Sequence, residues 1–88
     1  MKMDDIDLRR LRYFLMVAKE LHFTRAAEKI GIRQPPLSMH IRQLEDTIGA
    51  RLFIRHSRSV ELTPAGAAFQ TAAADIVARF EDAVTEAR

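Results

Sequence analysis

The 88-residue chain contains no cysteine, which excludes disulfide scaffolds, cysteine-containing zinc sites and catalysis by a thiol. It also has only three glycines, too few for a glycine-rich loop that binds phosphates. The longest uninterrupted apolar run, residues 13–18, is far too short to span a bilayer. The first five residues lack the apolar stretch of a signal peptide. These absences predict a small, soluble, cytoplasmic domain with no membrane partner.

Aromatic residues are scarce as well, at 7% of the chain, and tryptophan is absent. The hydrophobic content of 48% includes 13 alanines, which bury little area each. A core must therefore come from close packing of helices around a few large Leu, Ile and Phe side chains. The length suits one such domain of mainly α structure.

The net charge of +2 is unevenly distributed along the chain. Residues 1–60 contain 12 Lys or Arg against 7 Asp or Glu, whereas residues 61–88 contain 2 against 5. A basic front of this kind suits a polyanionic partner, and the acidic rear then has another role. An ordinary mixed surface is the alternative on charge alone.

Two short helices are predicted first. Apolar residues at helical spacing predict a helix over about 7–21. Aspartates crowd its start, where negative charge suits the helix dipole, at Asp4, Asp5 and the expected N-cap Asp7. Thr24 is the expected N-cap of a second helix, which runs to residue 30 and which Gly31 ends.

A third helix is expected to begin with Gln34 as its cap and Pro35 at its first position, and to end at Gly49. One face carries a core stripe at spacings of four, three and four, made of Leu37, Ile41, Leu44 and Ile48. The opposite face has Met39 as its single large apolar residue. This asymmetry favours a helix-turn-helix over about 23–42, against the alternative of a plain helical hairpin.

A small hairpin is predicted over about 51–62. Residues 51–55 are prone to form a strand, residues 60–62 alternate with period two, and a polar turn with Arg58 at its tip lies between them. A two-stranded hairpin beside a helix-turn-helix is a wing. We therefore expect a mainly α winged helix-turn-helix over residues 1–62.

Thr63 followed by Pro64 is a strong helix start, and the helix is expected to continue over residues 63–88. Apolar residues recur in a 3.5-residue repeat, which is typical of a seam between two helices. This seam, which we expect to mediate dimerisation, contains Phe69, Ala73, Ile76, Phe80, Ala83 and Ala87. We expect the helix to pack partly on its own domain and partly on a second copy. The alternative is a helix that only closes the monomer core.

No pattern indicates catalysis or metal binding. His22, His40 and His56 each stand alone, without a second ligand at metal-binding spacing. Ser38 lacks the G-x-S-x-G frame of a hydrolase nucleophile. We expect no enzyme activity, no cofactor and no metal site.

The arrangement does suit DNA, because a helix-turn-helix places its recognition helix in the major groove. Arg42 has the chemistry to bind guanine or a phosphate, and Gln34 the chemistry to pair with adenine. Thr24 suits a backbone phosphate, and at the wing Arg55 suits a phosphate and Arg58 the minor groove. The full set of expected DNA-binding residues is Thr24, Arg25, Arg33, Gln34, Pro35, Pro36, Ser38, Met39, Arg42, Arg55 and Arg58.

Several motifs resemble the LysR-type transcriptional regulators. Residues 23–29 read FTRAAEK, residues 34–38 read QPPLS, and residues 49–66 read GARLFIRHSRSVELTPAG. The opening Leu8, Leu11, Tyr13 and Phe14 match as well, so the resemblance covers residues 8 to about 70. It implies a sequence-specific DNA-binding domain that binds promoter DNA as a homodimer through the linker helix.

The resemblance also implies particular contacts. Gln34, Pro35, Pro36 and Ser38 lie at the DNA interface in the family, Arg58 corresponds to its minor-groove arginine, and Arg55 to a phosphate contact. This sequence departs from the family at Met39, where arginine is common, and at Arg33, which adds a candidate phosphate contact.

Beyond this chain, the resemblance implies an effector-binding domain in full-length relatives, a tetramer, and RNA polymerase as a candidate partner. That effector domain is absent here, so we expect the N-terminal piece of a longer regulator. The alternative function is a winged-helix protein-interaction module that docks through its alanine-rich helix and does not read DNA.

Overall fold

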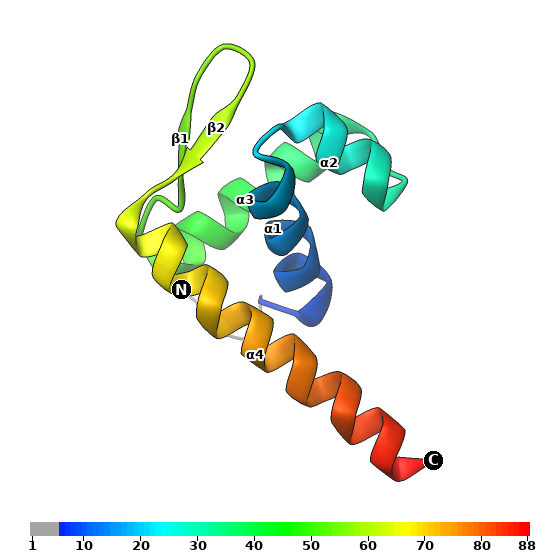
Figure 1. Cartoon of the computed structure of the whole chain (residues 1–88). Helices are drawn as coiled ribbons and strands as arrows, with labels where there is room; N and C mark the ends of the chain where they lie inside the picture. Colours follow the sequence, from blue (N-terminus) through cyan, green and yellow to red (C-terminus); the bar gives the residue numbers. More distant parts are fainter. Residues whose placement is uncertain (1–5) are drawn as a thin grey trace.

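The computed structural model describes residues 6–88, which form helices and a two-stranded hairpin in the order helix, helix, helix, strand, strand, helix (Figure 1). The elements are α1 (Leu8–Glu20), α2 (Phe23–Ile30), α3 (Gln34–Ile48), β1 (Phe53–Arg55), β2 (Val60–Leu62) and α4 (Pro64–Ala87). The predicted order of elements is confirmed. The expected dipole contacts of Asp4 and Asp5 lie outside the described residues.

Helix α1 begins as predicted, because the Asp7 carboxylate accepts a hydrogen bond from the Arg10 backbone N–H at 2.9 Å. Gly31 and Gly49 end α2 and α3 with φ of 90° and 82°. Both angles lie in the left-handed region that glycine adopts without steric cost.

Two predicted helix starts are wrong, by two residues for α2 and by one for α3. Helix α2 begins at Phe23, and its N-cap is His22, whose Nδ1 accepts from the Arg25 N–H at 3.1 Å; Thr24 is therefore not the cap. Helix α3 has Arg33 at its N-cap without a side-chain bond, so Gln34 is its first residue. The prolines that follow carry no N–H, which leaves little for a side-chain cap to satisfy.

The core lies where α1, α2, α3 and the first half of α4 meet the hairpin. Phe14 is fully buried at its centre, with its ring centroid 5.3 Å from that of Phe53 and 5.1 Å from that of Phe69. Ala26 and Ala27 are buried and let α2 approach its neighbours closely. The predicted stripe of α3 is buried at Leu37, Ile41 and Leu44.

The wing is an antiparallel pair in which Phe53 faces Leu62 and Arg55 faces Val60. The hairpin is anchored to the end of α1, because the Val60 N–H donates to the Leu21 carbonyl at 3.1 Å. Figure 1 shows the loop of the wing projecting away from the helices. The predicted hairpin is therefore confirmed, with a first strand shorter than residues 51–55.

Helix α4 begins at the predicted cap: Thr63 Oγ1 accepts from the Gly66 N–H at 2.9 Å. Its first half packs on the domain, and residues 78–88 are exposed along an arm that extends beyond it (Figure 1). The structure places Phe69 and Ala73 in the domain's own core. The other predicted seam residues, Ile76, Phe80, Ala83 and Ala87, are exposed.

Candidate nucleic-acid interface

The exposed face of α3 carries the residues that the sequence predicted to face a groove. Pro35, Pro36, Met39 and Arg42 are exposed, and 49% of Met39 is accessible. The opposite face is held in the core by Leu37 and its neighbours. The helix therefore presents polar and small groups outward while its position is fixed from behind.

Gln34 and Ser38 lie one turn apart at the start of this face, and both are half-buried. Gln34 Nε2 donates a hydrogen bond to Ser38 Oγ at 3.1 Å. This hydrogen bond restrains the Gln34 and Ser38 side chains, the first and last of the QPPLS motif.

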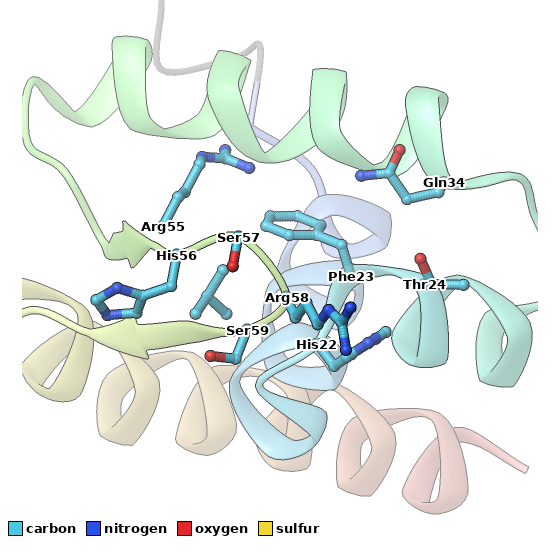
Figure 2. Close-up of a pocket in the computed structure, with 10 residues that line it drawn as sticks. His22, Phe23, Thr24, Gln34, Arg55, His56, Ser57, Arg58 and Ser59 are labelled. Carbon is cyan, nitrogen blue, oxygen red and sulfur yellow. The ribbon is translucent and has the colours of Figure 1, made fainter.

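An open groove of ≈ 370 Å³ separates the wing from the starts of α2 and α3 (Figure 2). Thr24 and Gln34 line it from the helices, and Arg58 lines it from the wing. Thr24, Arg25 and Arg58 are all exposed. Three separate elements thus bring predicted DNA-binding residues to one side of the molecule. Arg33, in the turn before α3, is exposed too.

Arg55, for which the sequence predicted a phosphate contact, has its side-chain partners inside the domain. Figure 2 shows its side chain running from the wing toward α3, and only 27% of it is exposed. Its Nη2 lies 3.7 Å from Glu45 Oε1, its Nη1 donates to Ser38 Oγ at 3.4 Å, and its Cζ stands 4.5 Å from the centroid of the Phe23 ring. Burial lowers the pKa of Arg55, and the Glu45 carboxylate opposes that shift.

Glu45 explains this direction, and sequence reasoning missed its role. Its side chain is 3% exposed, and Oε2 accepts from the backbone N–H groups of Leu52 and Phe53 at 2.8 and 3.3 Å. A buried carboxylate is stable only with a cation or several donors beside it, so it draws Arg55 inward. The available signal was spacing: residue 45 lies four after Ile41 and next to Leu44, on the buried side of α3.

A second polar contact joins α1 to α3. Arg10 donates from Nε to His40 Nδ1 at 3.3 Å and from Nη2 to Gln43 Oε1 at 2.8 Å. The His40 ring also packs edge-on against Tyr13 at 5.3 Å. Burial and then the nearby positive charges of Arg10 and Arg9 lower the pKa of His40, against a smaller opposing effect of Asp7. Neutral His40 therefore accepts from Arg10.

The histidines have separate partners. His22 caps α2, His40 binds Arg10, and His56 Nε2 lies 2.5 Å from Glu61 Oε2 across the wing. Within residues 6–88 no group of three or more His, Cys, Asp or Glu side chains is arranged to hold a metal ion. In the same part of the chain, no helix has the length and apolar character needed to cross a membrane.

The helices, the wing and the first turn of α4 are the parts that a known family shares. The family of bacterial regulatory helix-turn-helix proteins called lysR matches residues 8–67, from α1 into α4. The chain belongs to the LysR family. The family assignment agrees with the resemblance of the FTRAAEK and QPPLS motifs.

Curated relatives in the family are transcriptional regulators. XapR of Escherichia coli (strain K12) is 65% identical over 60 residues, which cover 68% of this chain and 20% of XapR. BudR of Klebsiella aerogenes is 53% identical over 83 residues, which cover 94% of this chain and 58% of BudR. This LysR-family chain thus spans only part of the length of these relatives.

Solved structures of the family extend the likeness to three dimensions. The DNA-binding domain of CbnR in a DNA complex superposes with a TM-score of 0.92 at 32% identity, covering 94% of this chain and 95% of that one. The DNA-binding domain of BenM, bound to benA site 1 DNA, superposes with a TM-score of 0.89 at 41% identity, covering 93% and 95%. The LysR-family chain therefore has the winged helix-turn-helix fold of these domains, with their long C-terminal helix.

Proposed function

We propose that this chain is the DNA-binding part of a bacterial LysR-family transcriptional regulator, which reads promoter DNA with α3 in the major groove and the wing at the minor groove. The observation that carries the proposal is the single exposed face on which α3, the start of α2 and Arg58 meet. The CbnR and BenM domains of the same fold were solved on DNA, which supports this use of the face.

Base reading is assigned to the exposed face of α3. Arg42 carries a planar guanidinium that fits guanine O6 and N7, and Gln34 keeps its Oε1 for an adenine amino group. Met39 and the two prolines offer apolar contact to thymine methyl groups. Met39 replaces a common arginine of the family, so the preferred sequence at this position differs from that of arginine-bearing relatives.

Phosphate contacts are assigned to the residues around this helix. Thr24 and Arg25 lie in the first turn of α2, where backbone N–H groups and the helix dipole favour an anion. Arg33 precedes α3 and is exposed. These contacts position the protein on the duplex without reading its sequence.

Dimerisation is assigned to the exposed seam residues in the second half of α4, residues 76–87. Ile76 and Phe80 are 49% and 47% exposed, which is unusual for large apolar side chains one turn apart on the same helix. A second copy that covers them brings a second recognition helix to the same DNA. For the whole regulator we propose a cytoplasmic tetramer with an effector-binding domain and contact with RNA polymerase, and no enzyme activity.

The test is selection of bound duplexes from a random DNA pool, followed by titration of the selected duplex at several salt concentrations. We expect an enriched sequence and a steep fall of log affinity with log salt, about 0.9 per phosphate neutralised. Enrichment without salt dependence would contradict the phosphate contacts. No enrichment at all would favour the alternative of a protein-interaction module.

Arg58 is the variant that tests the wing. Arg58→Ala is expected to weaken binding most where the flanks are A·T-rich, because a narrow minor groove attracts arginine. Arg79→Ala, on the exposed part of α4, is the matched control and should leave affinity unchanged. An equal loss of affinity on all flanking sequences would indicate that Arg58 contacts a phosphate and does not read the minor groove.

A further inference from the structure

The hydroxyl of Ser38 receives hydrogen bonds from two sides. Gln34 Nε2 donates to Ser38 Oγ at 3.1 Å from the preceding turn of α3, and Arg55 Nη1 donates to the same atom at 3.4 Å from the wing. A hydroxyl oxygen has two acceptor positions and one proton to donate. Both acceptor positions of Ser38 are therefore occupied before any ligand arrives.

The proton of Ser38 remains available. The hydroxyl donates to no residue within 6–88, although the side chain lies on the half-buried edge of the face assigned to DNA. The polarity of this group is thereby set by its neighbours, because Ser38 has a donor to offer and no acceptor.

Arg55 is held in this position by the interior of the domain. Glu45 lies 3.7 Å from Nη2 on one side, and the Phe23 ring lies 4.5 Å from Cζ on another. Glu45 is itself locked by the N–H groups at the start of β1. If the guanidinium moved away, the buried Glu45 carboxylate would lose its neighbouring positive charge, which is energetically costly.

We propose that Ser38 reads DNA as a hydrogen-bond donor only, and that Arg55, oriented by Glu45, is the positioning residue that imposes this polarity. The inference rests on the proposed function. In the major groove, guanine N7 and O6, adenine N7 and thymine O4 accept hydrogen bonds, whereas cytosine offers only its amino donor. The base that faces Ser38 in a bound site is therefore one with an acceptor, and cytosine is rejected there.

The experiment compares DNA sequences selected from a random pool by the wild-type chain and by its variants. Ser38→Ala first identifies the base position that Ser38 reads, by loss of preference there. The double variant Glu45→Gln with Arg55→Met then removes the donor together with the buried charge, and the amide oxygen introduced by Glu45→Gln can still accept from the start of β1. The double variant frees one acceptor on Ser38, so discrimination against cytosine at that position is expected to fall roughly tenfold.

Controls separate this effect from general damage. Arg58→Gln changes another wing arginine and is expected to weaken binding without changing the preference at the Ser38 position. Adding the double variant to Ser38→Ala should not change the base preference at that position any further, because Glu45 and Arg55 affect the preference only through the Ser38 hydroxyl. Circular dichroism verifies that each variant is folded. If the double variant does not fold, Gln34→Leu frees the other acceptor position of Ser38 and should weaken the discrimination against cytosine at the same base position.

The outcomes decide the inference separately from the proposed function. Retained rejection of cytosine in a folded variant with a freed acceptor would overturn it, as would Ser38→Ala without any change in base preference. In both cases a sequence enriched by the wild-type chain leaves the DNA-binding proposal intact. If the wild-type chain enriches no sequence, the proposed function fails and this inference fails with it.

Discussion

Gly66 sits where α4 approaches the loop before β1 more closely than any side chain allows. A Cβ added there would lie 2.1 Å from the backbone carbonyl oxygen of Leu52, and 3.0 Å from both the Leu52 carbonyl carbon and Leu62 Cδ2. The nearest obstacle is backbone, so no rotamer change relieves it. Gly66→Ala therefore requires α4 and this loop to separate by more than an ångström.

The cost follows from what that separation disturbs. The Leu52 carbonyl accepts from the Thr63 N–H at 3.0 Å, and the Thr63 hydroxyl donates to the Arg51 carbonyl at 2.6 Å. Two weakened hydrogen bonds cost about 1 kcal/mol each, and overpacking costs about 1–3 kcal/mol. The gain in helix propensity from Gly to Ala is only about 1 kcal/mol. We expect the free energy of unfolding to fall by about 2–4 kcal/mol.

Urea and thermal unfolding followed by circular dichroism, at one fixed protein concentration, measure this loss. For a chain of this size the melting temperature should fall by roughly 10–30 °C. Ala68→Gly, at an exposed position of the same helix, is the matched control and reports helix propensity alone. If Gly66→Ala is as stable as the wild type or more stable, the close approach does not limit this position and the reasoning is refuted.

Three further changes test the arm, the α1–α3 contact and the core. Phe80→Glu should yield a folded monomer in sedimentation and weaker DNA binding. The control Ala78→Glu, on the opposite side of α4, should stay dimeric. A wild-type chain that sediments as a monomer at high concentration would contradict this. The folded-state pKa of His40 lies below 6.5, so the unfolded chain binds the proton first and the stability of the wild type falls as pH drops through 6.5. His40→Gln should remove this loss of stability. A difference in unfolding free energy between wild type and variant that does not change with pH would contradict this. Leu37→Ala, at a fully buried side chain, should cost about 2–5 kcal/mol in urea unfolding. The exposed Met39→Ala should change stability by less than about 0.5 kcal/mol, and equal effects of the two substitutions would place Leu37 outside the core.

Local chemistry made much of the fold predictable. Asp7, Gly31, Gly49 and Thr63 act on backbone groups within a few residues of themselves, so their roles as caps and stops can be deduced from neighbours in the sequence. The two misplaced helix starts show the limit of this reasoning. An imidazole acted as a cap where Thr24 was expected, and the prolines left few N–H groups to cap at α3.

The candidate site was predictable as a set of residues and less so as an arrangement. The exposed face of α3 follows from its periodicity, because Leu37 and its stripe must be buried. The direction of Arg55 does not follow from its place on a strand next to a polar turn. It depends on Glu45, ten residues earlier, and on Phe23 in another helix.

The sequence alone is enough to predict a cysteine-free, mainly α domain with a winged helix-turn-helix, a long last helix and an excess of basic residues over residues 1–60. Three features become visible only in the folded chain: Arg55 turns inward, Gly66 lies against the backbone of Leu52, and Phe69 packs against Phe14 in the monomer core. The physical reason is the range of the interactions. Caps and periodicity act within a few residues, whereas a buried ion pair, a close backbone approach and a ring contact join segments that meet only when the chain has folded.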